Sequence, residues 1–125
     1  MTIMEAISAA DGLRNNHIDE QIKKAWLSEL DGRIFYELIR PYGKQDEFTG
    51  YGADTASDTA LIVPYPYDSL YVTYLEMQIA RQNNEMPRYN NAAVVFNEQY
   101  SAFRRWYSRN NVKPSVGISF PTRGN

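Results

Sequence analysis

The sequence predicts a mainly α-helical protein: a small antiparallel helical bundle with a long loop at residues 42–66 and an extended C-terminal tail. Apolar residues recur at spacings of three and four in several long segments, which is the period of one face of a helix. Stretches rich in glycine, proline, asparagine and aspartate separate these segments and favour turns. With 125 residues, 43% of them hydrophobic, the chain has the size and composition of one packed domain.

The first two helices are predicted from a cap and from a repeated spacing. Thr2 with Glu5 three positions later forms a capping-box pattern, which opens a short helix to about residue 10. A second helix of about 22 residues is expected to end before Pro41. Lys23 and Lys24 are predicted to lie off its apolar stripe. The stripe repeats every four positions through Ile18, Ile22, Trp26, Leu30, Ile34 and Leu38, and Leu27, Phe35 and Ile39 widen it.

Two more helices are predicted to pair as an antiparallel hairpin. The third helix is expected to begin near residue 68 and to end at Gln82. A short Asn83-Asn84 turn follows, after which Pro87 suits the first turn of a fourth helix that ends near residue 110. The second, third and fourth helices are expected to supply the core. The side chains predicted inside it are Trp26, Leu30, Ile34, Leu75, Phe96, Tyr100 and Phe103.

Residues 42–66 show no helical periodicity and are expected to form an interface with another subunit or a partner. The stretch holds three glycines, four acidic residues and the short apolar run Leu61-Ile62-Val63, which suits a strand. Compact domains rarely contain so long an irregular segment unless it serves a function. Aromatic side chains with a polar tip suit interfaces. The candidate subunit contacts in or beside this loop are Phe48, Tyr51, Tyr65 and Tyr67.

The C-terminal segment Lys113–Pro121 alternates apolar and small residues, a period typical of a strand. Its apolar face consists of Val116, Ile118 and Phe120. A strand without a neighbour in its own chain must find backbone hydrogen bonds elsewhere, and a second protein can supply them. We therefore expect a helical domain at residues 1–111 and a tail at 112–125 that is disordered when free and is ordered by a partner.

Charge is divided along the chain, although the net charge is only −2. Residues 1–85 hold seven Lys and Arg against fourteen Asp and Glu, a balance of −7. Residues 86–125 hold six basic residues against Glu98 alone, a balance of +5. Such separation favours oriented contacts, either within an assembly or with an acidic partner. The alternative is that the two halves neutralise each other inside one fold.

The run Arg104-Arg105-Trp106-Tyr107-Ser108-Arg109 carries the strongest basic signal. Basic residues beside aromatic ones can hold phosphates and stack bases, which is typical of nucleic-acid binding. A sequence pI near 5.4 argues against a dedicated DNA-binding protein. The alternatives are contact with a protein and a simple complement to the negative end of a helix.

The sequence lacks the residue patterns that catalysis and metal binding commonly require. The chain has no cysteine and a single histidine, His17, so nucleophilic triads have little to build on. The acidic residues from Asp46 to Asp58 do not match the spacing of an EF-hand calcium loop. We predict no enzyme activity, no cofactor and no metal. We also expect no secretory leader, because the N-terminal residues MTIMEAISAADG lack a basic region followed by an apolar core. No membrane helix is expected either, because no apolar run approaches the roughly 20 residues that a membrane span requires.

Several segments resemble one protein family. They are IKKAWLSELDGRIFYELI at 22–39, the FTGY segment from residue 48 followed by LIVPYPYDSLYVTYLE, and EMPRYNNAAVVFNEQYSAFRRWY. With the residues that join them, they cover over two-thirds of the chain. These segments resemble the small head–tail connector (adaptor) proteins encoded beside the capsid genes of tailed bacteriophages and of prophages of Gram-positive bacteria.

The resemblance implies a structural virion protein of the head–tail junction, assembled in the cytoplasm of the bacterial host. Such proteins are helical bundles that form a ring, usually a dodecamer, beneath the portal. The ring recruits a stopper or tail-completion protein, and genomic DNA passes through its lumen without sequence-specific contact. In this family the C-terminal segment often binds the portal. The candidate portal-binding residues are therefore Arg104, Arg105, Arg109, Lys113, Val116, Ile118 and Phe120.

Two functions of other classes remain as alternatives. A DNA-binding or DNA-packaging helical module of a phage would bind DNA in a salt-sensitive way. An enzyme would depend on His17 and ranks last.

Overall fold

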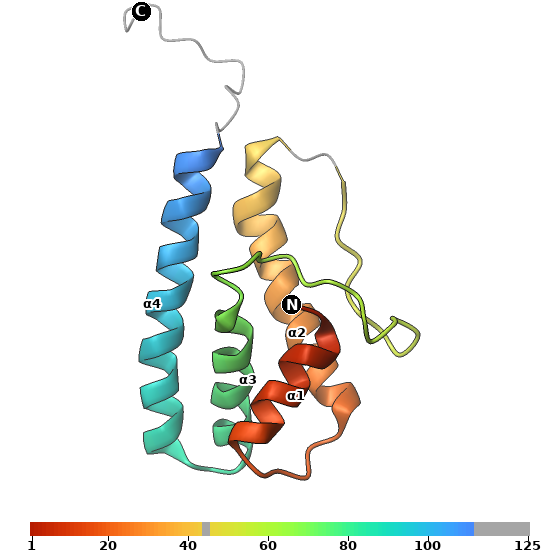
Figure 1. Ribbon diagram of the computed structural model, residues 1–125, viewed down its shortest axis with the longest axis vertical. Helices are drawn as coiled ribbons and strands as arrows, with labels where there is room; N and C mark the ends of the chain where they lie inside the picture. Colours follow the sequence, from red (N-terminus) through yellow and green to blue (C-terminus); the bar gives the residue numbers. More distant parts are fainter. Residues whose placement is uncertain (44–45, 112–125) are drawn as a thin grey trace, which may run out of the picture.

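The computed structural model describes residues 1–43 and 46–111, and it confirms the mainly α-helical fold (Figure 1). These residues form four α-helices and no strand: α1 (Ile3–Leu13), α2 (Glu20–Ile34), α3 (Ser69–Gln82) and α4 (Met86–Asn110). A π-helical turn, η1 (Phe35–Ile39), and a 3₁₀ turn, η2 (Arg40–Tyr42), continue α2. Figure 1 shows α4 along one edge of the bundle and the long loop along the opposite edge.

The helix α1 begins with the predicted capping box. Thr2 Oγ1 accepts a hydrogen bond from the N–H of Glu5 at 3.1 Å, and Glu5 Oε1 accepts one from the N–H of Thr2 at 2.9 Å. The helix continues to Leu13, beyond its predicted end. Its buried face, which packs against α3, stops earlier and consists of Ile3, Ala6, Ile7 and Ala10. Asp11-Gly12, which suggested a stop in the sequence, therefore lies inside the helix, just beyond its buried face.

The helix α2 and the turn after it bury the later part of the predicted stripe, Leu30, Ile34 and Leu38, but not its earlier part. Side chains four apart on an α-helix advance by about 40° around the axis, so a row of them winds away from one face. Ile22, near the start of that row, is 43% exposed, and Trp26 is only partly buried. The prediction that Trp26 lies inside was therefore only partly correct. The buried side chains of α2 are Lys23, Lys24, Leu27, Leu30, Asp31 and Ile34.

Both buried lysines have polar partners at the ends of their aliphatic stems, so the prediction that they lie off the packed face was wrong. Lys23 Nζ lies 2.8 Å from Asp11 Oδ1 at the end of α1. Lys24 Nζ donates to the carbonyl of Thr55 in the long loop at 3.0 Å. The stems cover apolar surface while the ammonium groups reach oxygen atoms. The two lysines thereby tie α2 to α1 and to the loop.

The end of α2 departs from regular α-helix. Each hydrogen bond of the π turn η1 spans one residue more than in an α-helix, which keeps Leu38 on the buried side after Ile34. Pro41 lies at the start of η2, where the missing N–H of a proline costs little. Gly43 ends the turn with φ of 100°, a left-handed conformation that suits glycine. Pro41 therefore permits another helical turn where the sequence predicted a stop.

The helices α3 and α4 form the predicted antiparallel hairpin. Their link is tight: Asn84 has φ of 63°, and the N–H of Glu85 donates to the carbonyl of Ala80 at 2.8 Å. Tyr100 of α4 packs against the core but stays partly exposed, so its predicted place inside was only partly correct. The other predicted core side chains, Trp26 apart, are buried: Leu30, Ile34, Leu75, Phe96 and Phe103.

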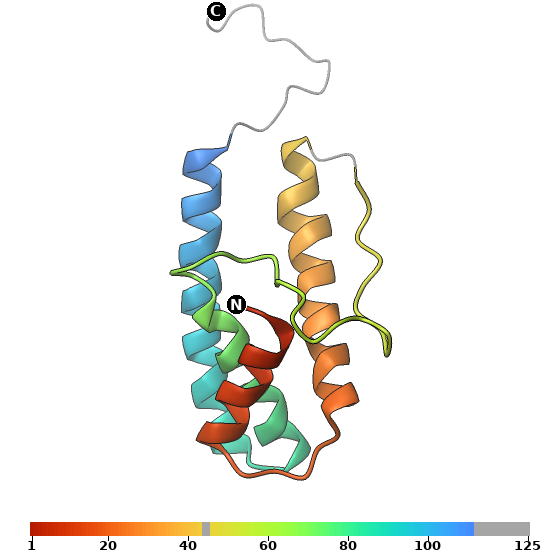
Figure 2. The ribbon, with the colours of Figure 1, turned by 45° about the vertical axis from the view of Figure 1, so that its right-hand side comes forward.

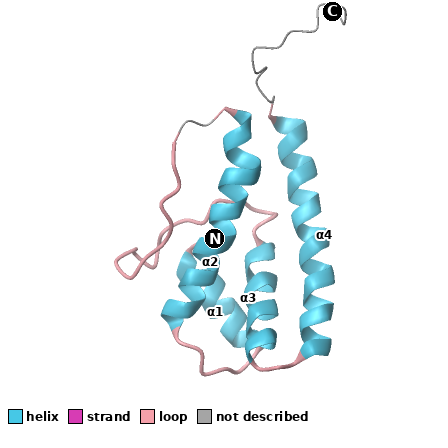
Figure 3. Cartoon of the chain, turned by 180° about the vertical axis from the view of Figure 1, so that it is seen from behind, coloured by secondary structure: helices cyan, strands magenta, loops and turns pink. Residues whose placement is uncertain are grey.

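The loop between α2 and α3 is as long and irregular as predicted, and it runs back along the bundle before it reaches α3 (Figure 3). No strand forms at Leu61–Val63; a single antiparallel bridge joins Thr2 and Ala60 instead. The N–H groups of Ile3 and Met4 donate to loop carbonyls, both at 3.0 Å. These bonds satisfy donors that the first turn of α1 leaves without helical partners.

Replacing Leu30 or Phe96 with alanine should lower the free energy of unfolding by about 2–5 kcal/mol, because each change leaves a cavity in the core. Ile22 on α2 and Val94 on α4 are matched controls, since they are 43% and 69% exposed. Their alanine variants should lose less than about 1 kcal/mol. The free energy of unfolding of all four variants is measured by urea denaturation monitored by circular dichroism. Losses below about 1 kcal/mol at both Leu30 and Phe96 would contradict this packing.

Candidate interaction surfaces

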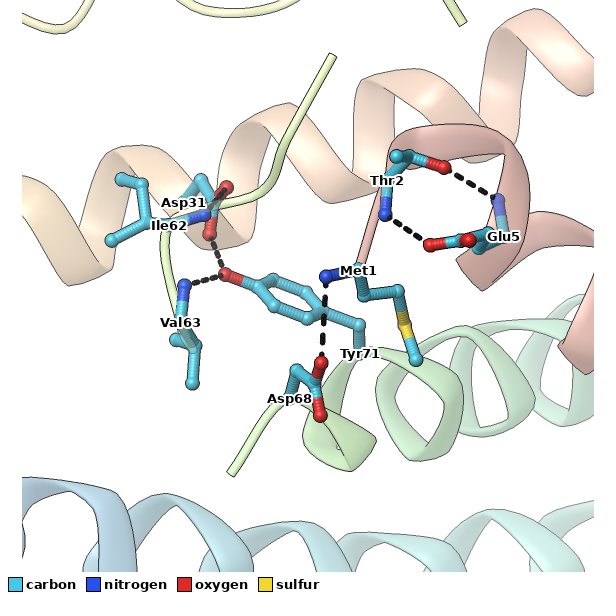
Figure 4. A network of polar contacts seen from close by, with 8 residues as sticks. All are labelled: Met1, Thr2, Glu5, Asp31, Ile62, Val63, Asp68 and Tyr71. Carbon is cyan, nitrogen blue, oxygen red and sulfur yellow. Dashed lines mark hydrogen bonds and ion pairs between the residues drawn. The ribbon is translucent and has the colours of Figure 1, made fainter. Parts of the chain in front are cut away.

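A buried polar centre at Asp31 joins the loop to two helices (Figure 4). The Asp31 carboxylate accepts hydrogen bonds from Tyr51 Oη and Tyr71 Oη, each at 2.5 Å. It accepts a third from the backbone N–H of Ile62 at 3.1 Å. Tyr71 Oη itself accepts from the N–H of Val63 at 2.8 Å, and Figure 4 shows its ring reaching from α3 toward both partners. The network therefore fixes the loop against α2 and α3 at one point.

Burial sets the protonation of this centre. It raises the pKa of Asp31 above the ordinary value of 3.8, and it outweighs the three hydrogen bonds, which lower that pKa. Burial and the neighbouring carboxylate also raise the pKa of Tyr51 and of Tyr71, so both hydroxyls keep the protons that they donate. Shifted carboxyl groups often mark active sites. Asp31, however, is fully buried and has donors on both oxygens, so its role is to hold the fold.

The first part of the loop packs on the outer side of α2 through Phe48 and Tyr51. Tyr36 Oη donates to the carbonyl of Phe48 and accepts from its N–H, both at 3.1 Å. The N–H of Tyr51 donates to Ser28 Oγ at 2.9 Å. Gly50 has φ of 90°, and a Cβ there would lie 2.8 Å from the same oxygen, so the close approach requires glycine. Phe48 and Tyr51 thus have intramolecular partners and are each partly exposed.

The other two candidate subunit contacts lie beside α4. Tyr67 packs on Trp106 and Phe103, with ring centroids 5.4 and 6.0 Å away. Tyr65 is 85% exposed, at a turn in which the N–H of Tyr67 donates to the carbonyl of Pro64 at 2.9 Å. In Figure 2 this part of the loop, coloured green, reaches across to α4. Of the four predicted contacts, Tyr65 is the one that the fold leaves largely in solvent.

The C-terminal half of α4 brings three predicted arginines together on an open surface. Arg104, Arg105 and Arg109 are exposed, and they line a hollow with Ser101 and Ser108. The guanidinium of Arg104 lies 5.9 Å from the centroid of the Tyr100 ring, a cation–π distance. Among residues 1–43 and 46–111, none of these arginines forms an ion pair. Their positive charge is therefore directed to solvent.

These features define one candidate interaction surface, which we call the arginine–tyrosine surface: Tyr65, Arg104, Arg105, Trp106 and Arg109. Arginine, tyrosine and tryptophan dominate the binding energy of many protein interfaces. The stacking of Tyr67 on Trp106 holds the turn that carries Tyr65 against the helix that carries the arginines. The remaining candidate portal contacts fall outside the described residues, as does the predicted strand: Lys113, Val116, Ile118 and Phe120.

Little in the described residues suggests other chemistry. His17 is exposed. No group of three or more His, Cys, Asp or Glu side chains is placed to hold a metal ion in the part of the chain that the structure describes. No helix within the same residues is both long and apolar enough to cross a membrane.

Comparison of the chain with models of protein families, with curated proteins and with solved structures finds no match. The resemblance to connector proteins is thus carried by sequence segments alone, and the function that it implies is a proposal.

Replacing Tyr71 with phenylalanine should lower the free energy of unfolding by about 2–4 kcal/mol, because Asp31 loses a donor and the buried N–H of Val63 loses its acceptor. Tyr74 is the matched control on the same helix, since its hydroxyl donates to Glu29 over a long distance of 3.5 Å and takes no part in the Asp31 network. Tyr74→Phe should cost less than about 1 kcal/mol. Equal losses in the two variants, measured by urea denaturation, would mean that the network adds no stability.

The stability that Asp31 contributes should fall as pH rises. Its pKa is higher in the folded than in the unfolded chain, so ionisation favours unfolding between the ordinary value of 3.8 and the raised folded pKa. Asp31→Asn removes this titration. The difference in unfolding free energy, wild type minus variant, should therefore decrease through that window and become constant above it. A difference that grows with pH would show that the hydrogen bonds outweigh burial.

Proposed function

We propose that this protein is a head–tail connector (adaptor) of a tailed bacteriophage or prophage, a structural virion protein that forms a ring beneath the portal. The main observation in support is the arginine–tyrosine surface at the end of α4. It lies directly before residue 112, where the predicted portal-binding tail begins. The segments that resemble connector proteins include both α4 and the turn that carries Tyr65. Position, charge and resemblance thus support the same function.

The chemistry of the surface suits an acidic protein partner. Arginines without ion pairs in the described residues create a positive field that steers an acidic surface toward them. Tyr65, which is 85% exposed, offers a large contact area with few rotatable bonds, and the partly exposed Trp106 adds to it. In a connector, the acidic surface would belong to the portal, and the tail would add a strand to it. Many copies around a ring let each single contact be modest.

The same proposal assigns the other partners. The ring, expected to be a dodecamer, would bind a stopper or tail-completion protein on its far side. Genomic DNA would pass through the lumen without sequence-specific contact. The protein would act at the head–tail junction of the virion after assembly in the cytoplasm of the bacterial host. Its role would be structural, so we expect no turnover and no cofactor.

A DNA-binding or DNA-packaging module is the second candidate, and the same hollow favours it. Three guanidinium groups and the hydroxyls of Ser101 and Ser108 line one surface, and both kinds of group bind phosphate oxygens. Such a module would bind duplex DNA with an affinity that falls steeply as salt rises. The two functions differ in the partner that the arginines meet, so a binding assay separates them.

Changing Arg104, Arg105 and Arg109 together to glutamine should weaken portal binding by about tenfold or more, because the variant loses steering and charge-assisted hydrogen bonds. Arg81→Gln is the matched control, since Arg81 is exposed in the last turn of α3 and lies outside the arginine–tyrosine surface. Surface plasmon resonance with immobilised portal at low and at physiological salt measures both. Binding by the triple variant at wild-type strength would contradict the assigned contact.

The tail is tested in the same assay. Truncation after Asn111, or the double change Ile118→Asp with Phe120→Asp, should remove portal binding while the helical circular dichroism signal stays unchanged. Duplex DNA is the second analyte. Two results together would contradict the connector function and support the DNA-binding one. The wild-type protein would bind DNA but not the portal, and the triple arginine variant would lose this DNA binding.

A further inference from the structure

A groove lies at the other end of α4, away from the arginine–tyrosine surface. It encloses about 290 Å³ where the end of α1 meets α3 and α4, and its lining includes Arg14, Glu76, Arg88, Asn91 and Val95. The apolar part of its rim is unusually open to solvent. Val95 is 48% exposed, and the neighbouring Val94 and Leu13 are 69% and 61% exposed. A groove of mixed apolar and charged groups suits a protein segment.

The groove has an excess of positive charge and a donor without a partner. Arg14 Nη2 lies 4.0 Å from Glu76 Oε2, a long ion pair. Arg14 Nε is buried and has no hydrogen-bond partner in the described part of the chain. Arg88 is exposed and forms no ion pair with any described residue. Two guanidinium groups against one carboxylate leave room for another carboxylate to bind.

The tip of the long loop has the opposite character. Residues 52–58 project from the side of the bundle that faces away from α4 (Figures 1 and 2). Neither of its two aspartates pairs with a cation among residues 1–43 and 46–111. Its other exposed side chains are small, so the segment is narrow enough to enter a groove. The exposed residues of the tip are Gly52, Ala53, Asp54, Ala56 and Asp58.

The tip is held in one conformation by its own chain. The N–H of Gly52 donates to Thr55 Oγ1 at 2.8 Å, and the N–H of Thr55 donates back to the carbonyl of Gly52 at 3.0 Å. Lys24 Nζ and the N–H of Met4 fasten the tip to α2 and α1, through the carbonyls of Thr55 and Ser57, both at 3.0 Å. A loop fixed in advance loses little conformational entropy when it binds.

We propose that the loop tip of one copy of this chain inserts into the groove of the next copy, where Asp54 and Asp58 meet Arg14 and Arg88. Charge complementarity selects a second copy as the occupant, because an acidic tip and a basic groove lie on different sides of the same molecule. Such a head-to-tail contact closes into a ring when the rotation between copies allows it. The inference rests on the proposed connector function and names its subunit contact.

Disulfide cross-linking tests this contact in the full chain, which has no native cysteine. Ala53→Cys with Asn91→Cys should give a ladder of linked multimers after mild oxidation, because a tip thiol meets a groove thiol only between neighbouring copies. Ala53→Cys with Ser101→Cys is the matched control. Ser101 is exposed on the same helix, ten positions and about 15 Å beyond Asn91, so at least tenfold less multimer is expected.

Size-exclusion chromatography with light scattering is run on the same samples. Assemblies that give no ladder, or equal ladders from both cysteine pairs, overturn the loop-in-groove contact and leave the connector function standing. A protein that stays monomeric, both alone and with its portal, overturns the contact and the connector function together.

A charge exchange gives a second readout on surface residues. Asp58→Arg and Arg88→Asp should each shift the assembly toward monomer, and the two changes in one chain should restore it, because the ion pair is rebuilt with reversed polarity. Circular dichroism checks that each variant remains folded. A double variant no better assembled than the single ones overturns the pairing of Asp58 with Arg88.

Discussion

The position of the long loop depends on the buried carboxylate of Asp31. Burying a charged group costs free energy, and here three donors from the loop and from α3 offset part of that cost. An apolar residue would fill the same volume but would give the loop no preferred register. Two surfaces follow from this register, because the tip at residues 52–58 begins just after Tyr51 and Tyr65 comes two residues after Val63. The carboxylate thereby defines where the loop can meet a partner.

The helices could be predicted from the sequence because their signals are local. The bounds of α3 and α4 follow from turn residues and a proline at fixed offsets, and tertiary contacts did not override them. The buried face of α2 could not be predicted in the same way. A row of residues four apart looks continuous in sequence but rotates on the helix, so the predicted stripe held the buried Leu27 and Ile34 but also Ile22, which is exposed. Lys23 and Lys24 were predicted to lie off the packed face because their ammonium groups are charged, whereas both side chains are buried.

The part of the candidate site on a helix could be predicted from the sequence, whereas the part that depends on tertiary contacts could not. Arg105 and Arg109 are four positions apart, which makes them neighbours on α4, and together with Arg104 they line one hollow. The Asp31 network joins residues that are 20 to 40 positions apart, so no local sequence pattern predicts it. One signal was present: Asp31 is four positions after Leu27 and three before Ile34, on the buried face. An acid at such a position needs buried donors, and the many tyrosines of this chain can supply them.

The division of charge along the sequence persists as a division in space. If the two halves neutralised each other, ion pairs would link α4 to the acidic part of the chain. The ion pairs of the described residues instead join groups within the first 76 positions: Met1 with Asp68, Arg14 with Glu76, Lys23 with Asp11, and Arg33 with Glu37. The arginines of α4 thus remain on one side of the bundle and the loop aspartates on the other.

That polarity determines how copies of the chain can meet. Like sides repel each other, whereas opposite sides attract, so this polarity supports the proposed head-to-tail contact and disfavours a symmetric back-to-back dimer. A head-to-tail contact uses one positive and one negative surface per copy and leaves the far end of α4 free for a different partner. The electrostatic part of the attraction acts mainly over a Debye length, about 8 Å at physiological salt. Added salt should therefore slow the encounter of copies more than it loosens a tip already seated in its groove.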